Sequence, residues 1–400
     1  MLYSLCVYYP CPMQAAEFAK NLSGRIFMSV TSENDVTGTV ETVSAPRYHG
    51  GNVREAAERY GFREREIIDF SANVNPLGPS PAAQRAAKKA LAFIDRYPDP
   101  EMKELRQGIA DYYGISPEQA VCGNGSTALI HLIPRVFRPR RVLIPVPTFA
   151  EYAAAVQDAG GEVVPFPLDP RKGFRIDAVD MAFALKGVDM AFLCNPNNPS
   201  GLLVPEAEMA EIAGYALREG VRLVVDETFI EFSGDGSLVQ EAAPSPHLIC
   251  IRAFTKFFGM PGLRVGYAVA GDETAETLRA GQEPWSVSTP ASKAALAALH
   301  DWRYIRKTRK FIARERDELM AALRLLPGVE FSAGSANFLL LRVAAHESPV
   351  LAHALAQRGI LVRDCSSFGG LGNSFLRVAV RTRRENERLI SALRQVLLLP

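Results

Sequence analysis

Short β-rich segments alternate with helical segments from Ala82 to Ala270, and this alternation constrains the fold more than any other feature. Helical stretches such as PEAEMAEIAGYALREG separate the β-rich segments. Strands separated by helices predict a mostly parallel sheet that is covered on both faces. The sequence therefore predicts an α/β fold. The β-rich segments are RVLIPVP, EVVPFPL, MAFLCNP, VRLVVDE and HLICIRA.

The pattern changes along the chain, whose 400 residues exceed what one small core needs. Residues 81–272 are predicted to form the large domain. Residues 273–400 combine long helices with the strands NFLLLRV, ILVRDC and FLRVAVR, which predicts a smaller α+β domain. Residues 46–80 are interpreted as an N-terminal arm that contributes to the site and to the small domain. Residues 1–45 resemble nothing that follows, and their stretch SVTSENDVTGTVETVSAP is polar and lacks a clear period. We interpret them as a loose extension, or as the result of a start codon placed too far upstream, and assign them no role.

Composition and charge exclude several classes of protein. The formal net charge is +1, so no global field would attract nucleic acid or a membrane surface. The six cysteines contain no C-x-x-C pair, which argues against a zinc site and a disulfide framework. No apolar run is long enough to span a bilayer. We expect a cytoplasmic protein without a metal, a nucleic-acid partner or a membrane partner, whose anionic ligands are held by local groups.

A glycine turn before a helix is the first candidate binding motif. Ligands of an open α/β sheet bind beyond the carboxyl ends of the strands. In CGNGSTALIHLI, Gly125, Ser126 and Thr127 open a helical run just after a strand. Backbone N–H groups at a helix start, together with two hydroxyls, suit a phosphate. An ordinary turn with a Ser or Thr N-cap would give the same string.

Two further candidates follow apolar strands. Asn198, in CNPNNPSG, places a side-chain donor after the strand MAFL, although the string also suits a plain turn. Asp226 ends the strand of LVVDETF, where a buried carboxylate is costly unless a cation pairs with it. A protonated pyridine nitrogen is such a cation; helix capping and magnesium binding are the alternatives.

Lys256 lies in FTKFFGMPGLRVGY, between Thr255 and two phenylalanines. A lysine in an apolar pocket has a lowered pKa that suits Schiff-base chemistry, whereas a lone lysine here is more often a surface charge. Arg264 follows a Gly/Pro turn that could bring it to the same anion. Pyridoxal phosphate (PLP) needs a lysine, an acid for its ring nitrogen, a phosphate cup and a donor to its phenolic oxygen. The motifs together supply all four, so we predict PLP as the cofactor.

The strings GNGST, PTFAEY, NPNNPSG, DETF and TKFFGMPGLRVGY, in this order, resemble fold type I of PLP enzymes, the aspartate-aminotransferase type, from about Tyr48 to the end. The resemblance implies a large domain with a mostly parallel seven-stranded sheet, a smaller C-terminal domain and a homodimer. It also implies that Lys256 and Asp226 are catalytic, as the Schiff-base lysine and the partner of the ring nitrogen. The implied cofactor contacts are Asn198 to the phenolic oxygen, Phe149 on the ring, and Gly125, Ser126, Thr127, Thr255, Arg264 and the neighbouring subunit's Tyr97 at the phosphate.

Two positions depart from the family pattern. Phe229 replaces a tyrosine that in many relatives donates to the phenolic oxygen, so the cofactor's absorption and ionisation are expected to differ from theirs. Ala253 replaces a serine that often helps to hold the phosphate, which leaves more of this role to Thr255 and Arg264.

The fold type does not by itself select the reaction. Two subfamilies are most similar: histidinol-phosphate aminotransferases, and the threonine-phosphate decarboxylases of cobalamin biosynthesis. Both need a second anion site. The strings HGGNVREAAERYG, DFSANVNPLGPS and RDCSSFGGL resemble the decarboxylases. Arg377 matches the arginine that forks onto the substrate carboxylate. The full set of implied substrate contacts is His49, Gly50, Gly51, Asn52, Asn73, Asn75, Asn198, Arg363 and Arg377.

The resemblance therefore predicts decarboxylation of L-threonine O-3-phosphate, a phosphorylated amino acid, to (R)-1-aminopropan-2-ol O-2-phosphate. Three alternatives remain open. The glycine-rich loop is alternatively a plain turn in which Asn52 caps the next helix. The enzyme is alternatively a histidinol-phosphate aminotransferase. A PLP-binding regulator without turnover is a third alternative, but residues 1–45 are too short and polar for the DNA-binding domain that such proteins usually carry.

Overall fold

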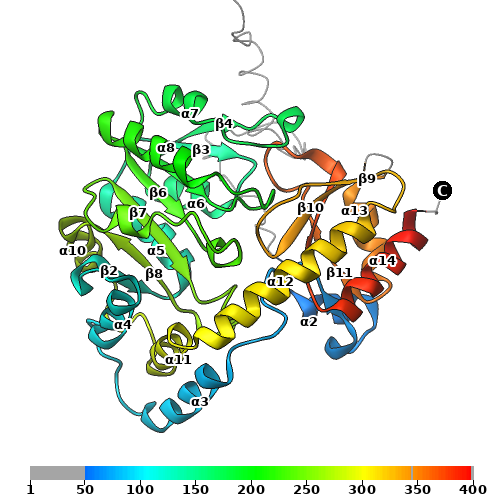
Figure 1. Ribbon diagram of the computed structural model, residues 1–400, viewed down its shortest axis with the longest axis horizontal. Helices are drawn as coiled ribbons and strands as arrows, with labels where there is room; N and C mark the ends of the chain where they lie inside the picture. Colours follow the sequence, from blue (N-terminus) through cyan, green and yellow to red (C-terminus); the bar gives the residue numbers. More distant parts are fainter. Residues whose placement is uncertain (1–49, 344–345, 398–400) are drawn as a thin grey trace, which may run out of the picture. The chain divides into compact units, whose positions relative to one another are not determined.

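The computed structural model describes residues 50–343 and 346–397 (Figure 1). The strands are β1 (Ile68–Asp69), β2 (Ala120–Gly123), β3 (Arg141–Val146), β4 (Glu162–Pro167), β5 (Met190–Cys194), β6 (Arg222–Asp226), β7 (Leu248–Ala253), β8 (Gly266–Ala270), β9 (Val329–Phe331), β10 (Phe338–Val343), β11 (Ile360–Leu361), β12 (Arg363–Asp364) and β13 (Phe375–Ala379). The helices are α2 (Val53–Tyr60), α3 (Pro81–Ala90), α4 (Lys103–Tyr113), α5 (Gly125–Phe137), α6 (Glu151–Asp158), α7 (Ala178–Ala184), α8 (Glu206–Arg218), α9 (Val239–Ala242), α10 (Asp272–Ala280), α11 (Thr289–Leu299), α12 (Trp302–Leu323), α13 (Ser348–Ala356) and α14 (Arg383–Leu397).

The large sheet has seven strands in the order β2-β8-β7-β6-β5-β3-β4. Strands β4, β3, β5, β6 and β7 run parallel, while β8 pairs antiparallel with both β7 and β2. Every residue of β5, β7 and β8 is buried, as expected for strands covered on both faces. The predicted α/β fold with a mostly parallel seven-stranded sheet is confirmed.

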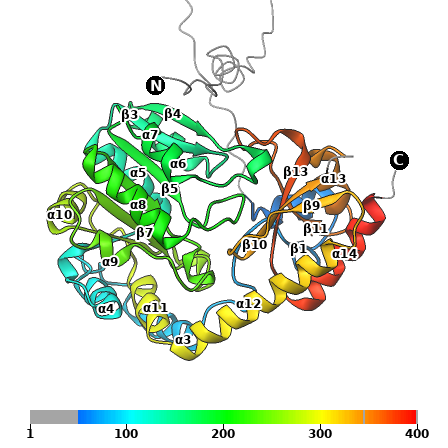
Figure 2. The same cartoon turned by 45° about the horizontal axis from the view of Figure 1, so that its top comes forward.

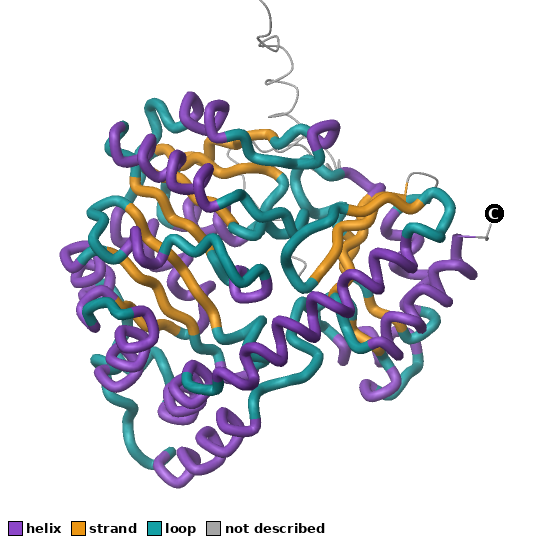
Figure 3. Tube along the Cα trace, viewed as in Figure 1, coloured by secondary structure: helices purple, strands orange, loops and turns teal. Residues whose placement is uncertain are grey.

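Helices cover both faces of this sheet (Figures 1 and 3). One core layer is formed with α5, α6 and α10, and the other with α4, α7, α8 and α9. Because consecutive side chains of a strand point to opposite faces, Val224 joins the first layer and Val225 the second. This alternation also decides which side chains at the strand ends can reach the candidate site.

A second, antiparallel sheet has the order β12-β13-β10-β9 and lies in the C-terminal part of the chain. The 22-residue helix α12 extends from beside α11 to this sheet (Figures 1 and 2). The N-terminal arm joins the same region, because β1 pairs in parallel with β11. The predicted smaller C-terminal α+β domain is confirmed. No helix in the described ranges is both long and apolar enough to cross a membrane.

Candidate active site

The carboxyl ends of the central strands carry the predicted cofactor residues. Asp226 is the last residue of β6 and lies opposite Cys194, the last residue of β5. Asn198 follows β5 by four residues and Lys256 follows β7 by three. Since parallel strands end at the same edge of a sheet, these side chains emerge on one side, where α/β folds bind ligands.

Lys256 is surrounded by groups that favour its neutral amine. Burial, followed by the nearby charges of Arg377 and Arg264, lowers its pKa from the ordinary 10.5 to about 8, and Asp69 and Asp226 partly oppose this shift. A neutral amine is the nucleophilic form, so this lysine is suited to covalent capture of an aldehyde.

Asp226 is a buried carboxylate with spare acceptor capacity. It is 3% exposed and accepts hydrogen bonds from the hydroxyl of Tyr152 (2.8 Å) and the backbone N–H of Thr228 (2.9 Å). Burial raises its pKa, and the hydrogen bonds from Thr228 and Tyr152 oppose that rise. A carboxylate has about four lone-pair sites, so Asp226 can also accept from a protonated ring nitrogen. The site therefore fits the acid that PLP requires.

The predicted phosphate cup forms where α5 begins. Gly125 has a φ of 78°, and a Cβ there would lie 2.5 Å from Nη2 of Arg264, so this guanidinium packs directly against the glycine. The hydroxyl of Ser126 accepts from that of Thr228 (3.5 Å). The structure thus places Arg264 beside the free N–H groups of a helix start, an arrangement that suits a phosphate.

Asn198 and Arg377 are in direct contact, since Oδ1 of Asn198 accepts from Nη1 of Arg377. The other two asparagines of the NPNNPSG turn are used by the turn itself: Asn195 bonds to Val204, and Asn197 bonds to Pro147, Thr148 and Ser200. Because Arg377 fixes the oxygen of the Asn198 amide, its Nδ2 is left to donate to a ligand such as the phenolic oxygen of PLP.

Arg377 and Arg363 are directly opposite each other on β13 and β12. Nη2 of Arg377 donates to the carbonyl of Ser71 (2.8 Å), and Asn73, with its amide oxygen turned towards Arg377, accepts from Nε (3.3 Å) and Nη1 (3.2 Å). Nη2 of Arg363 donates to Ser367 (2.7 Å). Burial lowers the pKa of both guanidinium groups, that of Arg377 to about 10. Neither arginine forms an ion pair with a carboxylate within the described residues.

The glycine-rich loop packs against Ser71. Gly51 donates its N–H to the hydroxyl of Ser71 (2.8 Å), and a Cβ on Gly50 would collide with the carbonyl of the same residue. Asn52 is the N-cap of α2 and accepts from the N–H of Glu55 (3.3 Å), as expected if the loop is a plain turn that caps this helix. The preceding His49 lies outside the described residues.

Asn75 has structural partners. Its Nδ2 donates to the carbonyl of Phe257 (2.9 Å) and contacts the hydroxyl of Thr308 (3.4 Å), while its N–H donates to the carbonyl of Lys256 (3.0 Å). These contacts tie the arm to the lysine loop and to α12. A substrate contact for Asn75 stays a prediction.

The remaining cofactor residues differ in their surroundings. Thr255 is 6% exposed and lies directly before Lys256, and Thr127 is half-buried in the first turn of α5. Phe149 is half-buried, with its ring edge-on to Tyr152 at 5.6 Å. Tyr97 is 81% exposed, and its ring lies 4.7 Å from that of Trp285. Its exposure suits the predicted contact with a second subunit, which stays a prediction.

Both departures from the family pattern are in buried positions. Phe229 is 4% exposed and packs edge-on against Phe338 at 5.0 Å, so no hydroxyl donates from this position. Ala253 is 1% exposed at the end of β7.

Sequence reasoning missed three residues that hold the site together. Tyr152 and Thr228 hold Asp226, and Ser71 contacts both Arg377 and Gly51. Tyr152 is part of PTFAEY, but nothing in that string distinguishes it from a core tyrosine. Ser71 acts partly through its backbone carbonyl, for which a sequence gives no signal.

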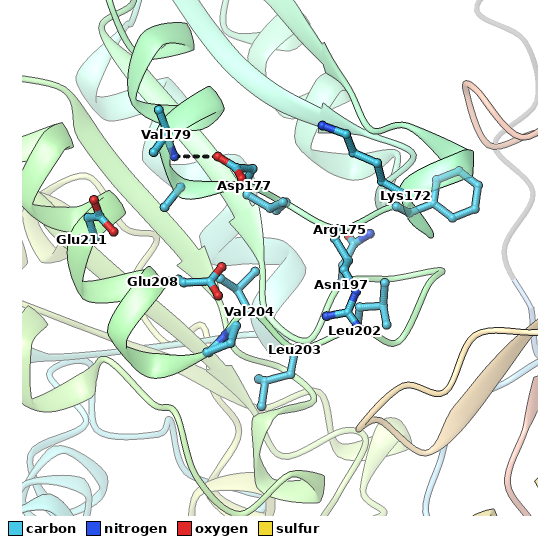
Figure 4. A pocket seen from close by; sticks show the side chains of 14 residues that line it. Lys172, Arg175, Asp177, Val179, Asn197, Leu202, Leu203, Val204, Glu208 and Glu211 are labelled. Carbon is cyan, nitrogen blue, oxygen red and sulfur yellow. Dashed lines mark hydrogen bonds between the residues drawn. The ribbon is translucent and has the colours of Figure 1, made fainter.

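A separate cavity of about 610 Å³ lies beside the NPNNPSG turn (Figure 4). Asn197 and Leu202 line it together with Arg175, and Glu208 and Glu211 line it from α8. Neither Lys256 nor Asp226 is part of its described lining, so this cavity is distinct from the candidate active site.

The chain matches the family described as aminotransferase class I and II over residues 65–393. It is 36% identical over 351 residues to threonine-phosphate decarboxylase from Salmonella typhimurium, and the alignment covers 87% of this chain and 96% of that protein. The structure of histidinol-phosphate aminotransferase from Clostridium acetobutylicum is 32% identical, with a TM-score of 0.78 over 82% of this chain and 99% of that one. The structure of L-threonine-O-3-phosphate decarboxylase from Porphyromonas gingivalis is 29% identical, with a TM-score of 0.74 over 83% of this chain and 99% of that one.

The protein belongs to the class I and II aminotransferase family of PLP-dependent enzymes. PLP is the cofactor predicted from the four motifs, and the expected fold type is the one found.

Proposed function

We propose that the chain is a threonine-phosphate decarboxylase that converts L-threonine O-3-phosphate to (R)-1-aminopropan-2-ol O-2-phosphate and carbon dioxide, a reaction of cobalamin biosynthesis. The observation that carries this proposal is the in-register pair of Arg363 and Arg377. Directly opposite side chains of an antiparallel pair have Cβ atoms about 4.5–5.5 Å apart, and like charges there are destabilising. A substrate with two anionic groups on neighbouring carbons would compensate both guanidiniums.

Threonine phosphate has this distribution of charge, because its carboxylate and phosphate are borne on adjacent carbon atoms. Histidinol phosphate has a phosphate but no carboxylate, so it would leave one guanidinium without an anion. The similarity of the N-terminal arm to the decarboxylases also supports the proposal.

In this proposal Arg377, with help from Arg363, would bind the substrate and orient its carboxylate for release. Bound PLP supplies an electron sink for the electron pair that is left when the bond between the carboxylate and Cα breaks. Asp226 keeps the ring nitrogen protonated. Lys256 would hold PLP before the substrate binds, and its amine would then donate a proton to Cα, directly or through a water. Its pKa of about 8 permits both forms of the amine near neutral pH.

The test incubates purified holoenzyme with threonine phosphate while carbon dioxide and aminopropanol phosphate are measured. Release of both in equal amounts, without 2-oxoglutarate, is the expected result. Rapid conversion of histidinol phosphate that depends on 2-oxoglutarate, without release of carbon dioxide, would instead assign the chain to the aminotransferases. Bound PLP without turnover of any amino acid would favour the regulator.

Arg363→Gln should raise KM for threonine phosphate by at least about tenfold, because a charge-assisted hydrogen bond contributes about 1.5–3 kcal/mol. The matched control is Arg342→Gln on β10 of the same sheet, where the arginine pairs with Glu330 at 3.0 Å on the surface. The control should leave KM unchanged. Equal KM values for Arg363→Gln and the wild type would remove Arg363 from the substrate site.

A further inference from the structure

A buried arginine lies between two buried glutamates immediately beside the candidate site. Arg252 is 5% exposed, Glu227 is 0% exposed and Glu231 is 4% exposed. Nη1 of Arg252 donates to Oε2 of Glu227 (2.9 Å), and its Nε lies 3.3 Å from Oε1 of Glu231. Charged side chains are costly to bury, so these three must be well paired and hydrogen-bonded to neighbouring groups.

Neighbouring polar groups complete this arginine cluster. Nη2 of Arg252 donates to the hydroxyl of Tyr113 (2.6 Å), which is hydrogen-bonded to that of Tyr267 (2.7 Å). Glu227 accepts from the hydroxyl of Ser237 (2.8 Å) and the N–H of Leu238 (2.7 Å). The cluster thereby joins β7, β8 and α4 to the segment that follows β6.

The cluster lies where two strands end. The last backbone pair of β6 and β7 joins Asp226 to Ile251. The N–H of Glu227 still donates to the carbonyl of Ile251 (2.8 Å), and the ion pair of Glu227 and Arg252 extends the contact by one residue. Asp226 is the residue before Glu227, and Lys256 follows Arg252 by four residues, so both site residues are close in sequence to this ion pair.

Consecutive side chains of a strand point to opposite faces. Asp226 therefore reaches the cofactor side, with Tyr152, while the adjacent Glu227 reaches the arginine cluster on the other face. On this face Arg309 of α12 also donates to the carbonyl of Glu231 (2.9 Å).

We propose that Arg252 is a positioning residue: its guanidinium clamps the ends of β6 and β7 from the face opposite the cofactor and thereby sets the separation of Asp226 from Lys256. Arg252 does not touch the cofactor in this proposal and acts through Glu227. The inference concerns the binding and ionisation of PLP, so it holds whichever amino compound the enzyme converts.

The fork geometry of arginine provides the test. In Arg252→Lys the charge is kept, but one ammonium group on a flexible stem cannot bind Glu227, Glu231 and Tyr113 together. We expect a shift of at least about half a pH unit in the titration of the bound cofactor's visible absorbance, and a dissociation constant for PLP raised at least about threefold.

The matched control is Arg222→Lys. Arg222 is the first residue of β6, its guanidinium lies 3.7 Å from the ring centroid of Phe137, and it is at the opposite end of the strand from Asp226. This variant should keep the wild-type titration and PLP affinity.

A purely structural role makes a different prediction. It would lower the melting temperature of Arg252→Lys but leave the titration and the PLP affinity of the folded protein unchanged, and this result would overturn the proposal. If Arg252→Lys does not fold, Tyr113→Phe decides, since it keeps the contacts of Arg252 with both glutamates and removes only a hydroxyl, which accepts from Nη2 and is hydrogen-bonded to Tyr267. A smaller shift in the same direction supports the positioning role, and an unchanged titration contradicts it.

Discussion

The amine of Lys256 is held beside the guanidiniums of Arg377 and Arg264, and this arrangement makes a residue-scale prediction about cofactor capture. With a pKa of about 8, about one amine in ten is neutral at pH 7, against about one in three thousand for an ordinary lysine. Only the neutral amine attacks the aldehyde. The rate at which apoenzyme binds PLP should therefore rise up to about pH 8 and then level off.

Rapid-mixing absorbance measurements between about pH 6.5 and 9.5 would follow this rate across the shifted and ordinary pKa ranges. A rate that keeps rising in proportion to hydroxide up to the highest pH would mean that the Lys256 amine has the pKa of a solvent-exposed lysine.

Lys256→Ala should retain no turnover, whether the enzyme is a decarboxylase or an aminotransferase.

Tyr152→Phe tests the support of Asp226. The variant loses the 2.8 Å hydrogen bond to the carboxylate, so the Asp226 pKa, already raised by burial, should rise further. Asp226 would then hold the ring nitrogen protonated less effectively. We expect kcat/KM to fall at least about tenfold, since a hydrogen bond to a charged group contributes about 1.5–3 kcal/mol.

Tyr215→Phe is the matched control, because its hydroxyl donates to Glu211 (3.3 Å) on an exposed helix face. Its kcat/KM should equal that of the wild type. If Tyr152→Phe and Tyr215→Phe change kcat/KM by the same factor, Tyr152 does not act through Asp226.

At the scale of residues, the sequence was informative where chemistry is unusual for its position. Asp226 at the end of an apolar strand and Lys256 among phenylalanines could be predicted, because each needs a partner that the core does not supply. Tyr152 and Ser71 could not be predicted. The Tyr152 hydroxyl contacts Asp226, which is 74 residues away in the sequence, and the Ser71 carbonyl contacts Arg377, which is 306 residues away. Both are ordinary polar groups that any Tyr or backbone carries.

At the scale of elements, the start of α5 makes a prediction that separates backbone strain from cofactor contact. Gly125→Ala places a Cβ against Arg264 and forces a side chain into a positive φ, which costs about 1–2 kcal/mol. Gly114→Ala, at the end of α4, imposes the same strain at a φ of 68° with nothing within 4 Å of the added Cβ.

Both variants should lose similar stability in thermal unfolding of the apoenzyme. Only Gly125→Ala should also weaken PLP binding, measured by fluorescence titration. Equal PLP affinities in the two variants would show that Arg264 is not held against this turn when the phosphate binds.

Strand-forming runs were predictable, but the pairing of the shortest strands was not. Five strands of the large sheet, β3 to β7, are apolar runs that their own composition identifies. β1, β11 and β12 have two residues each. The predicted strand ILVRDC is divided into β11 and β12, which pair with β1 and β13 in two different sheets. Arg363 lies opposite Arg377 because β12 pairs with β13. The sequence could therefore name both arginines as candidates for the site, but it could not show that they are directly opposite each other.

At the scale of the whole molecule, the proposed homodimer predicts that inactive variants can complement each other. If Tyr97 serves the neighbouring site, mixing Lys256→Ala with Tyr97→Ala, followed by subunit exchange, creates dimers with one intact site. Random exchange in a two-fold dimer should restore about one quarter of the wild-type activity. No recovery, while light scattering shows mixed dimers, would place Tyr97 outside the partner's site.

The parallel pairing of β1 with β11 also bears on how the protein is made. It brings Ile68 beside Ile360, so an early part of the chain must wait for a late part before it is paired. During synthesis at about 5–20 residues per second, the arm with Ser71 remains unpaired for tens of seconds after it is translated. Every strand of the large sheet, together with Lys256, is translated before Ile360, whereas Arg363 and Arg377 come after it. A pause in translation between them would therefore leave a chain that carries the complete sequence of the large sheet but lacks both arginines of the candidate site.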